Sequence, residues 1–187
     1  MGLDMYLNKK IYIGANYEHR KVAGVIDLTE GEDPVRPIKV DFNKVSEIVE
    51  QVCYWRKANA IHNWFIENCA DGEDDCRTMS VWRSQLEDLR NVCQKVLDEC
   101  ILVKGEIANG QRMNSASGLM EDILEEGEYI ENPEIAEELL PTHSGFFFGS
   151  TNYDQWYISD LEHTVKVLTE ELDKPDDGSL YEYHASW

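Results

Sequence analysis

Two cations and three other polar side chains lie close together in the sequence and have the chemical types of a binding site. They are Arg56, Lys57, Asn59, His62 and Asn63. Adjacent Arg and Lys side chains bind anions such as phosphate. A histidine titrates near neutral pH, so His62 is the first candidate for a general acid or base, with Arg56 holding an anion. The alternative for His62 is a core histidine whose ring nitrogens are hydrogen-bonded within the protein.

A second polar group surrounds the three phenylalanines at 146–148. Gly145 and Gly149 bound this run, and glycine lets another backbone or a ligand approach closely. Hydroxyl groups stand on both sides of it, at Thr142, Ser144, Ser150 and Thr151, and Tyr153, a further candidate for ligand binding, follows. The short apolar run favours a buried strand. Two interpretations remain: glycine turns that enter and leave a central strand, or a hydroxyl-rich turn that lines a pocket.

The first cluster falls in a segment with helical periodicity. Apolar residues follow three-four spacing from Val45 to Trp55, and the same face continues through Asn59 and His62, which predicts one helix over 43–68. A polar group on a core-facing stripe must find hydrogen-bond partners or costs about 1–3 kcal/mol. The end of this helix is therefore expected to face a pocket, a subunit interface or an internal network.

Three further segments have the periodicity and start signals of helices: 80–103, 134–140 and 154–172. Ser80 and Asp154 are the expected N-caps of the first and the last. The 80–103 helix is expected to pair in antiparallel fashion with the 43–68 helix.

Besides the phenylalanine run, three segments have the alternation or composition of strands: 2–13, 22–28 and 36–40. Residues 105–118 are expected to be irregular and 119–129 to form a short acidic helix. The tail at 179–187 is expected to add an edge strand or to remain loose.

These elements predict an α+β fold, in which a small, mainly antiparallel sheet packs against three longer helices. The sheet is expected to contain the amino-terminal strand and the 146–148 strand. A chain of 187 residues suits one domain, 1–187. Within it, 105–132 is expected to be a flexible acidic segment and 174–187 a loose tail.

The charge is strongly negative, with a formal net value of −20 at pH 7. No Lys or Arg occurs between Arg112 and Lys166, so the negative potential is concentrated in the second half. Such a surface disfavours nucleic acid and anionic membranes and attracts a basic partner. It is either a solvated acidic face or a mimic of the nucleic-acid phosphate backbone. The candidate partner-binding acids are Glu121, Asp122, Glu125, Glu126 and Glu128.

The five cysteines are expected to be core thiols, kept reduced in the cytosol. A zinc site built from Cys69, Cys76 and a histidine is the alternative, although no C-x-x-C pair is present. No cofactor or metal is expected. Neither a membrane span nor a signal peptide is recognisable, so a cytoplasmic location is expected.

Three stretches carry a resemblance to a known family: Gly-Leu-Asp-Met-Tyr-Leu at 2–7, Trp-Arg-Lys-Ala-Asn-Ala-Ile-His-Asn-Trp-Phe at 55–65, and the motif from Leu-Pro-Thr through Gly-Phe-Phe-Phe-Gly-Ser to Tyr-Asp at 140–154. Together they resemble a family of small proteins found in phages and prophages. The resemblance implies no reaction and no catalytic residues. It implies the context of an accessory phage protein, a category in which inhibitors of host defence, including anti-CRISPR proteins, are common.

Two functions follow. The favoured one is a counter-defence inhibitor whose acidic second half occupies the basic nucleic-acid channel of a host protein, such as a defence effector. The other is a protein that binds or sequesters a nucleotide-like ligand, with Arg56 and Lys57 on its phosphate. In that case a base would stack on Trp55, Tyr153 or Trp156, and Arg56→Ala would abolish binding without unfolding. Enzyme activity is less favoured, because no phosphate loop, zinc-protease motif or nucleophile elbow is present.

Overall fold

The computed structural model describes residues 2–14, 44–115, 117–145 and 147–187. A four-stranded antiparallel sheet has the order β2-β1-β6-β3, and β4 and β5 form a separate two-stranded sheet. The strands are β1 (Asp4–Tyr12), β2 (Glu47–Arg56), β3 (Met79–Val81), β4 (Leu102–Met113), β5 (Met120–Ile130) and β6 (Leu180–Ser186). The helices are α1 (Asn59–Cys69), α2 (Arg83–Glu99), α3 (Glu134–Leu139) and α4 (Gln155–Leu172). The predicted α+β class is confirmed.

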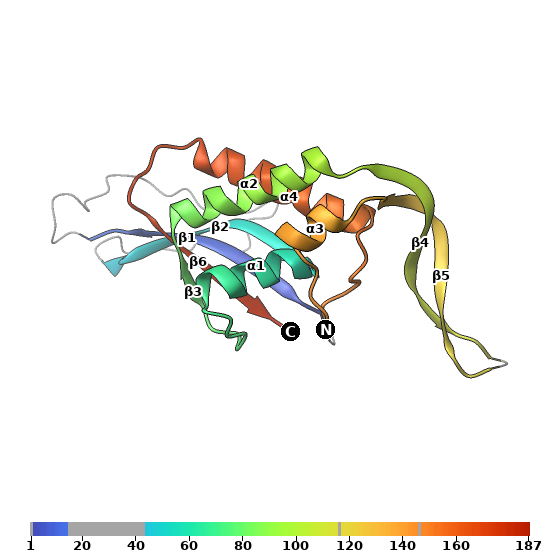
Figure 1. Cartoon of the computed structure of the whole chain (residues 1–187). Coiled ribbons are helices and arrows are strands. Elements are labelled where there is room, and N and C mark those ends of the chain that lie inside the picture. Colours follow the sequence, from blue (N-terminus) through green and yellow to red (C-terminus); the bar gives the residue numbers. More distant parts are fainter. Residues whose placement is uncertain (1, 15–43, 116, 146) are drawn as a thin grey trace, which may run out of the picture.

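The core lies on one face of the four-stranded sheet. β1 alternates as predicted, and Met5 and Leu7 are fully buried. β6 adds Tyr183 and Ala185 to the same face, because they pair directly with Leu7 and Met5. The helices lie on this side of the sheet (Figure 1).

Aromatic packing joins the helices to the sheet. The ring of Phe65 on α1 stacks on Tyr183 with centroids 4.0 Å apart, and Trp55 meets Phe65 edge-on at 6.0 Å. The helix that packs along α2 is α4, so the predicted pairing of 80–103 with 43–68 is wrong. The helix itself is confirmed, but it begins at Arg83, and Ser80 lies in β3.

The predicted helix over 43–68 is half wrong. Residues 47–56 form β2, and the helix begins only at Asn59. This stretch contains β-branched and aromatic residues, which fit a pleated surface, and at its end the buried Cys53 and Trp55 alternate with the exposed Tyr54 and Arg56. Pairing along the whole length of β1 outweighs the helical spacing of the apolar residues.

The predicted strand at the phenylalanine run is also wrong for its described residues, 147 and 148. They belong to the loop between α3 and α4, which contacts the chain before β1 through Leu3 N–H and Phe147 O at 3.2 Å. Phe148 N–H instead bonds back to Gly145 O at 3.2 Å. Phe148 inserts into the core edge-on to His62.

The segment 105–129 is expected from the sequence to be irregular and then helical, but its described residues belong to the β4–β5 hairpin. Gly105 and Gly127 face each other across it. A Cβ at Gly105 would lie 2.6 Å from the ring of Tyr129, and one at Gly127 would lie 2.4 Å from Ile107 Cδ1. The two glycines therefore permit close cross-strand packing, which a reading of the segment for helix or turn signals misses. The hairpin extends away from the body of the protein (Figure 1).

The tail is ordered into the sheet. β6 takes up residues 180–186 and lies between β1 and β3, so it is neither loose nor an edge strand. The predicted strands at 22–28 and 36–40 lie outside the described residues. None of the described helices is long and apolar enough to cross a membrane.

Candidate functional site

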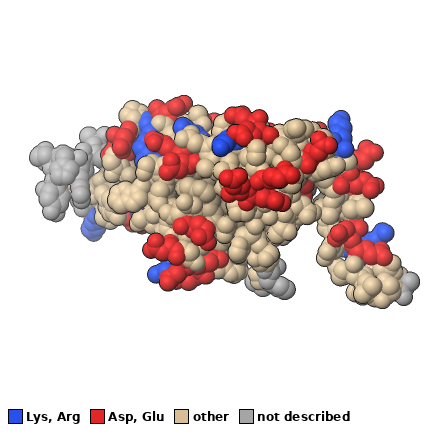
Figure 2. Space-filling view, in the orientation of Figure 1, with Lys and Arg blue, Asp and Glu red and all other residues tan. Residues whose placement is uncertain are grey.

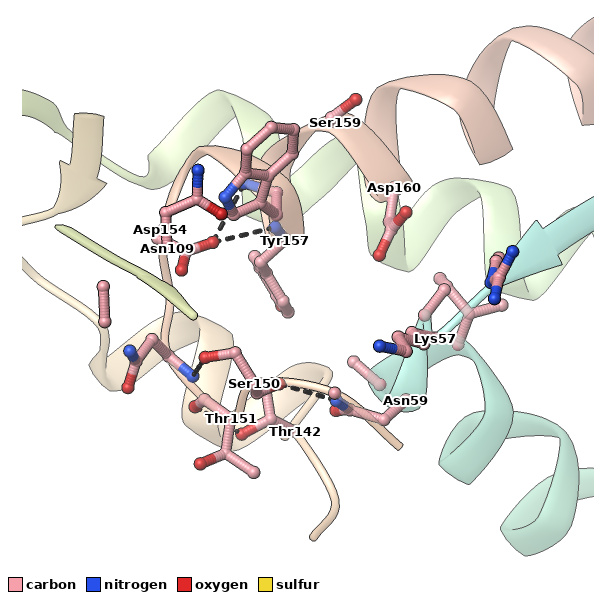
Figure 3. Close-up of a pocket in the computed structure, with 18 of the residues that line it drawn as sticks. Lys57, Asn59, Asn109, Thr142, Ser150, Thr151, Asp154, Tyr157, Ser159 and Asp160 are labelled. Atoms are coloured by element: carbon pink, nitrogen blue, oxygen red, sulfur yellow. Dashed lines mark hydrogen bonds between the residues drawn. The ribbon is translucent and has the colours of Figure 1, made fainter. Parts of the chain in front are cut away.

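A cavity of about 800 Å³ lies where four parts of the chain meet: the end of β2 with the start of α1, the α3–α4 loop, the first turns of α4, and the hairpin (Figure 3). Small-molecule sites are typically clefts of about 300–1,000 Å³. Both polar groups singled out in the sequence contribute to it. The residues that line the cavity from these groups are Arg56, Lys57, Asn59, Thr142 and Ser150.

Asn59 joins the two polar groups. Its side chain is buried and donates to Phe148 O at 3.1 Å and to Ser150 O at 2.7 Å, while its Oδ1 accepts from His143 N–H at 3.0 Å. Three hydrogen bonds from one amide hold the α3–α4 loop against the start of α1. Asn59 therefore shapes the cavity wall.

Thr142 and Ser150 complete the loop wall. Thr142 Oγ1 donates to Thr151 O at 3.0 Å, and Ser150 Oγ accepts from Asn152 N–H at 3.1 Å. Tyr153 also stabilises the loop, because its hydroxyl accepts a hydrogen bond from Thr142 N–H at 3.3 Å. The loop thus keeps its shape through its own hydrogen bonds.

Arg56 and Lys57 lie at the opposite wall, and both are exposed. Lys57 has a positive φ of 62°, a left-handed conformation that costs a non-glycine residue on the order of 1 kcal/mol or more. Its N–H donates to Leu3 O at 2.8 Å, which ties this turn to the start of β1. Among the described residues, no carboxylate forms an ion pair with either side chain.

Four of the predicted ligand-binding residues do not line the cavity: His62, Asn63, Ser144 and Tyr153. His62 is almost completely buried. Its Nδ1 lies 2.7 Å from the Tyr183 hydroxyl and its Nε2 lies 3.2 Å from Asp74 Oδ2. Burial lowers the pKa of His62, against the opposing effect of Asp74. These contacts fit the alternative interpretation of His62 as a hydrogen-bonded core histidine.

Acidic residues of α4 and the hairpin form the rest of the wall. Asp154 is the N-cap of α4, as predicted, and its Oδ1 accepts from Trp156 N–H at 2.9 Å and Tyr157 N–H at 3.4 Å. Asp160 lies one and a half turns further along, and Asp122 approaches from β5. Figure 3 shows Asp160 and Lys57 on different walls, each pointing toward the open space between them.

Sequence reasoning missed Asp160 and the hairpin residues as parts of this site. Asp160 precedes the buried Leu161 within an amphipathic stripe, so its sequence context carries no signal. The hairpin contributes Asn109 and Gly110 at a break in the β4–β5 register, and only the fold brings this bulge to α4.

Burial, reinforced by the charge of Asp154, raises the pKa of Asp160 to about 7. The folded state therefore holds the proton of the Asp160 carboxyl more tightly than the unfolded chain does, because an aspartate in the unfolded chain has a pKa of about 4. As pH rises from about 4 to 7, the contribution of Asp160 to the free energy of unfolding falls, because the folded protein must ionise a partly buried carboxyl.

Asp160→Asn is expected to stabilise the protein at pH 8 by about 1–3 kcal/mol and to change its stability little at pH 4. Urea denaturation of both proteins at the two pH values measures this difference. Asp88→Asn, at an exposed position of α2, is the matched control and is expected to have little effect at either pH. Equal effects of Asp160→Asn at both pH values would contradict the raised pKa.

Cys53 and Cys93 are buried, Cys69 and Cys100 are partly buried, and Cys76 is exposed, so the core-thiol prediction fails for Cys76. In the described part of the chain, no three His, Cys, Asp or Glu side chains are grouped as metal ligands. The zinc site considered for Cys69 and Cys76 thus has no ligand set there.

No protein-family model, curated protein or solved structure matches this chain. The resemblance to phage proteins therefore stays a prediction from the sequence motifs.

Proposed function

We propose that this protein binds a small anionic ligand of nucleotide type in the cavity between α1, α4 and the hairpin. One observation carries the proposal: two adjacent cations without ion-pair partners among the described residues line a cavity of about 800 Å³ in a chain of net charge −20. Small-ligand binding was the second hypothesis from the sequence, and the cavity makes it the stronger one.

Arg56 and Lys57 are distinguished by their place, because they are adjacent in sequence and both line the cavity, whereas several other described cations also lack an ion pair. Lys9, Lys10, Arg77 and Arg83 each lie within 4.0 Å of a carboxylate. For Arg56 and Lys57, no carboxylate of the described residues lies within this distance. A guanidinium can hold two phosphate oxygens at once, and an ammonium next to it adds a point charge. A phosphate would thus supply the missing counter-charge.

An aromatic ring is available for a base. Of the three aromatic residues considered from the sequence, Trp55 is buried and Tyr153 packs edge-on against Tyr157 at 5.0 Å. Trp156 lines the cavity with 51% of its surface exposed. Stacking of a base on an exposed indole contributes about 1–3 kcal/mol. In the phage context predicted from the sequence, such a protein would sequester a nucleotide signal of the host.

The test is a calorimetric titration with nucleotide monophosphates at low and high salt. The variant Lys57→Met removes the charge but keeps the stem that packs on Gly149. It is expected to lose about tenfold in affinity, and Arg56→Ala as much or more. Lys95→Met, at an exposed position of α2, is the control and should bind normally. Undiminished binding by the Arg56→Ala/Lys57→Met double variant would refute the proposal.

A second candidate, the counter-defence inhibitor that binds a basic host protein, is favoured by the surface of the hairpin. All five predicted partner-binding acids lie on β5, and Figure 2 shows acidic side chains along the hairpin and the adjoining body. The far half of the hairpin also exposes apolar side chains, each 42–68% exposed: Met113, Leu119, Met120, Ile123 and Leu124. Exposed apolar groups rimmed by like charges are typical of protein-binding surfaces. A hairpin of two strands is marginal alone, so a partner that covers it would stabilise it.

Neutralising the hairpin tests this candidate separately from the cavity. The variant carries Glu121→Gln, Glu125→Gln, Glu126→Gln and Glu128→Gln and leaves Asp122, which lines the cavity, unchanged. We expect its low-salt association with a basic partner, recovered from a defence-competent host, to weaken about tenfold or more. A control with the same charge change on α2, at Glu87, Asp88, Asp98 and Glu99, should bind normally. Equal loss in both variants would mean that only net charge matters and would contradict a docking role for the hairpin.

A further inference from the structure

Asp154 has a buried oxygen without a partner at the cavity. The residue is only 2% exposed, and its Oδ1 caps α4. Its Oδ2 is buried and accepts no hydrogen bond from any described residue. The base of the hairpin fixes this position, because Ile130 N–H donates to Tyr153 O at 2.9 Å and Tyr129 bridges to Asp154. The carboxylate is thus held in place with half of its accepting capacity unused.

An unused buried carboxylate oxygen is costly and uncommon in folded proteins. Burial raises the pKa of Asp154, although the two capping N–H groups oppose the rise. Because Asp154 is among the residues that line the cavity, a bound ligand can supply the missing donor. Asp154 Oδ2 is therefore an unpaired acceptor at a position where a bound ligand would be desolvated.

The charges of the cavity are divided between its walls. Arg56 and Lys57 lie at the α1 wall, whereas Asp154 and Asp160 lie on α4 and Asp122 on the hairpin. A ligand that fits both walls has an anionic group at one end and an N–H donor at the other. A nucleotide whose base carries an amino group has this arrangement, and its flat ring matches Trp156.

We propose that Asp154 Oδ2 accepts a hydrogen bond from the amino group of a bound base, so that the site selects nucleotides with an amino-substituted base over their keto analogues. The proposed binding of phosphate by Arg56 and Lys57 is the basis for this selectivity. A site built to accept from an N–H group rejects an analogue that presents a carbonyl oxygen, because two acceptors then face each other.

Asp154→Asn is the variant that tests this role without removing the helix cap. The two backbone N–H groups of Trp156 and Tyr157 require an acceptor, so the asparagine keeps its oxygen toward them and places its NH₂ where Oδ2 was. The substitution exchanges an acceptor for a donor at the cavity and leaves the shape of the side chain almost unchanged. Thermal unfolding of the variant reports whether α4 remains capped.

The measurement compares AMP with IMP and CMP with UMP by titration at pH 8. The wild type is expected to bind AMP and CMP about tenfold or more tightly than IMP and UMP. Asp154→Asn is expected to reverse this preference, whereas Asp88→Asn, at an exposed position of α2 outside the cavity, should keep it. The wild-type comparison needs no variant, so it decides the matter even if Asp154→Asn folds poorly.

Three outcomes would overturn the inference. Equal affinity of the wild type for amino and keto nucleotides would mean that Oδ2 does not read the base, and so would an unchanged preference in folded Asp154→Asn. In both cases the phosphate contact of Arg56 and Lys57 would stand. Failure of the wild type to bind any of the four nucleotides would overturn the inference together with the proposed function.

Discussion

Asn59→Asp is expected to destabilise the protein by about 2–4 kcal/mol and to open the cavity, although the new side chain has the same shape. The amide nitrogen of Asn59 faces the carbonyl oxygens of Phe148 and Ser150. A carboxylate would place a charged acceptor against these two acceptors and lose both hydrogen bonds. A negative charge in the first turn of a helix is otherwise favourable. The predicted loss of stability is thus opposite in sign to the stabilisation that the helix dipole alone would give.

Urea denaturation measures the loss of stability, and nucleotide titration measures the loss of the site. Asn63→Asp places the same change one turn along α1, away from the cavity, and is the control. We expect it to alter stability by less than about 1 kcal/mol. If Asn59→Asp were as stable as the wild type, its hydrogen bonds would not be what holds the α3–α4 loop in place.

Lys9→Met is expected to destabilise the protein by about 3–5 kcal/mol, the cost of breaking a buried ion pair. Lys9 is 4% and Glu171 is 3% exposed. The ammonium of Lys9 lies 3.3 Å from Glu171 Oε1 and 3.0 Å from Asp177 Oδ2. Tyr181 also donates to Glu171 at 2.9 Å. Without Lys9, a buried carboxylate loses a main counter-charge in the link between α4 and β1.

Lys10→Met is the matched control. Lys10 is the next residue of β1 and pairs with Glu182 at 2.8 Å, with both side chains 23% exposed. Exposed pairs contribute about 0–1 kcal/mol, so this variant should remain close to the wild type in a denaturation experiment. Similar losses in the two variants would contradict the special role of the buried pair.

The two carboxylates that pair with Lys9, those of Glu171 and Asp177, determine how the effect of Lys9→Met depends on pH. Burial alone would raise the pKa of Asp177, but hydrogen bonds from Ser179 and Lys9 outweigh it and hold the pKa at about 2. Glu171 is likewise buried, and bonds from Lys174, Tyr181 and Lys9 lower its pKa. Stability from such carboxylates is present above their unfolded pKa near 4 and is lost as pH falls toward 2. The difference between Lys9→Met and the wild type should therefore shrink across this range.

Local periodicity predicted the elements whose packing is simple. The alternation around Met5 and Leu7 identified β1, and the apolar stripe from Tyr157 to Leu168 identified α4 together with its cap at Asp154. In each of these elements, one face is buried, so the spacing of its apolar residues is enough to predict it. The fold class followed from them.

The misses came from long-range pairing. The residues of β2 have helical spacing as well as strand composition, and pairing with β1 decides between the two. By sequence alone, Gly105 indicates the end of an element. In the fold it pairs with Gly127, and each glycine leaves room for a side chain of the opposite strand. The phenylalanine run has the composition of a strand, yet Phe148 serves as an anchor for a loop.

The site could be predicted only in part, for the same reason. Arg56, Lys57 and Asn59 are neighbours in sequence, so their shared polarity was visible. Asp160 and the bulge at Asn109 are distant from them in sequence, and the fold alone brings them together. His62 had the right chemistry and spacing, but its ring faces Tyr183 and Asp74 within the core.

Native mass spectrometry tests the central claim most directly. The wild type and the Arg56→Ala/Lys57→Met double variant are purified side by side at low salt and then equilibrated with AMP. The account predicts one retained nucleotide mass per wild-type chain, its retention by Lys95→Met, and its absence from the double variant. The same adduct on the double variant, or none on the wild type, would contradict nucleotide binding at this cavity.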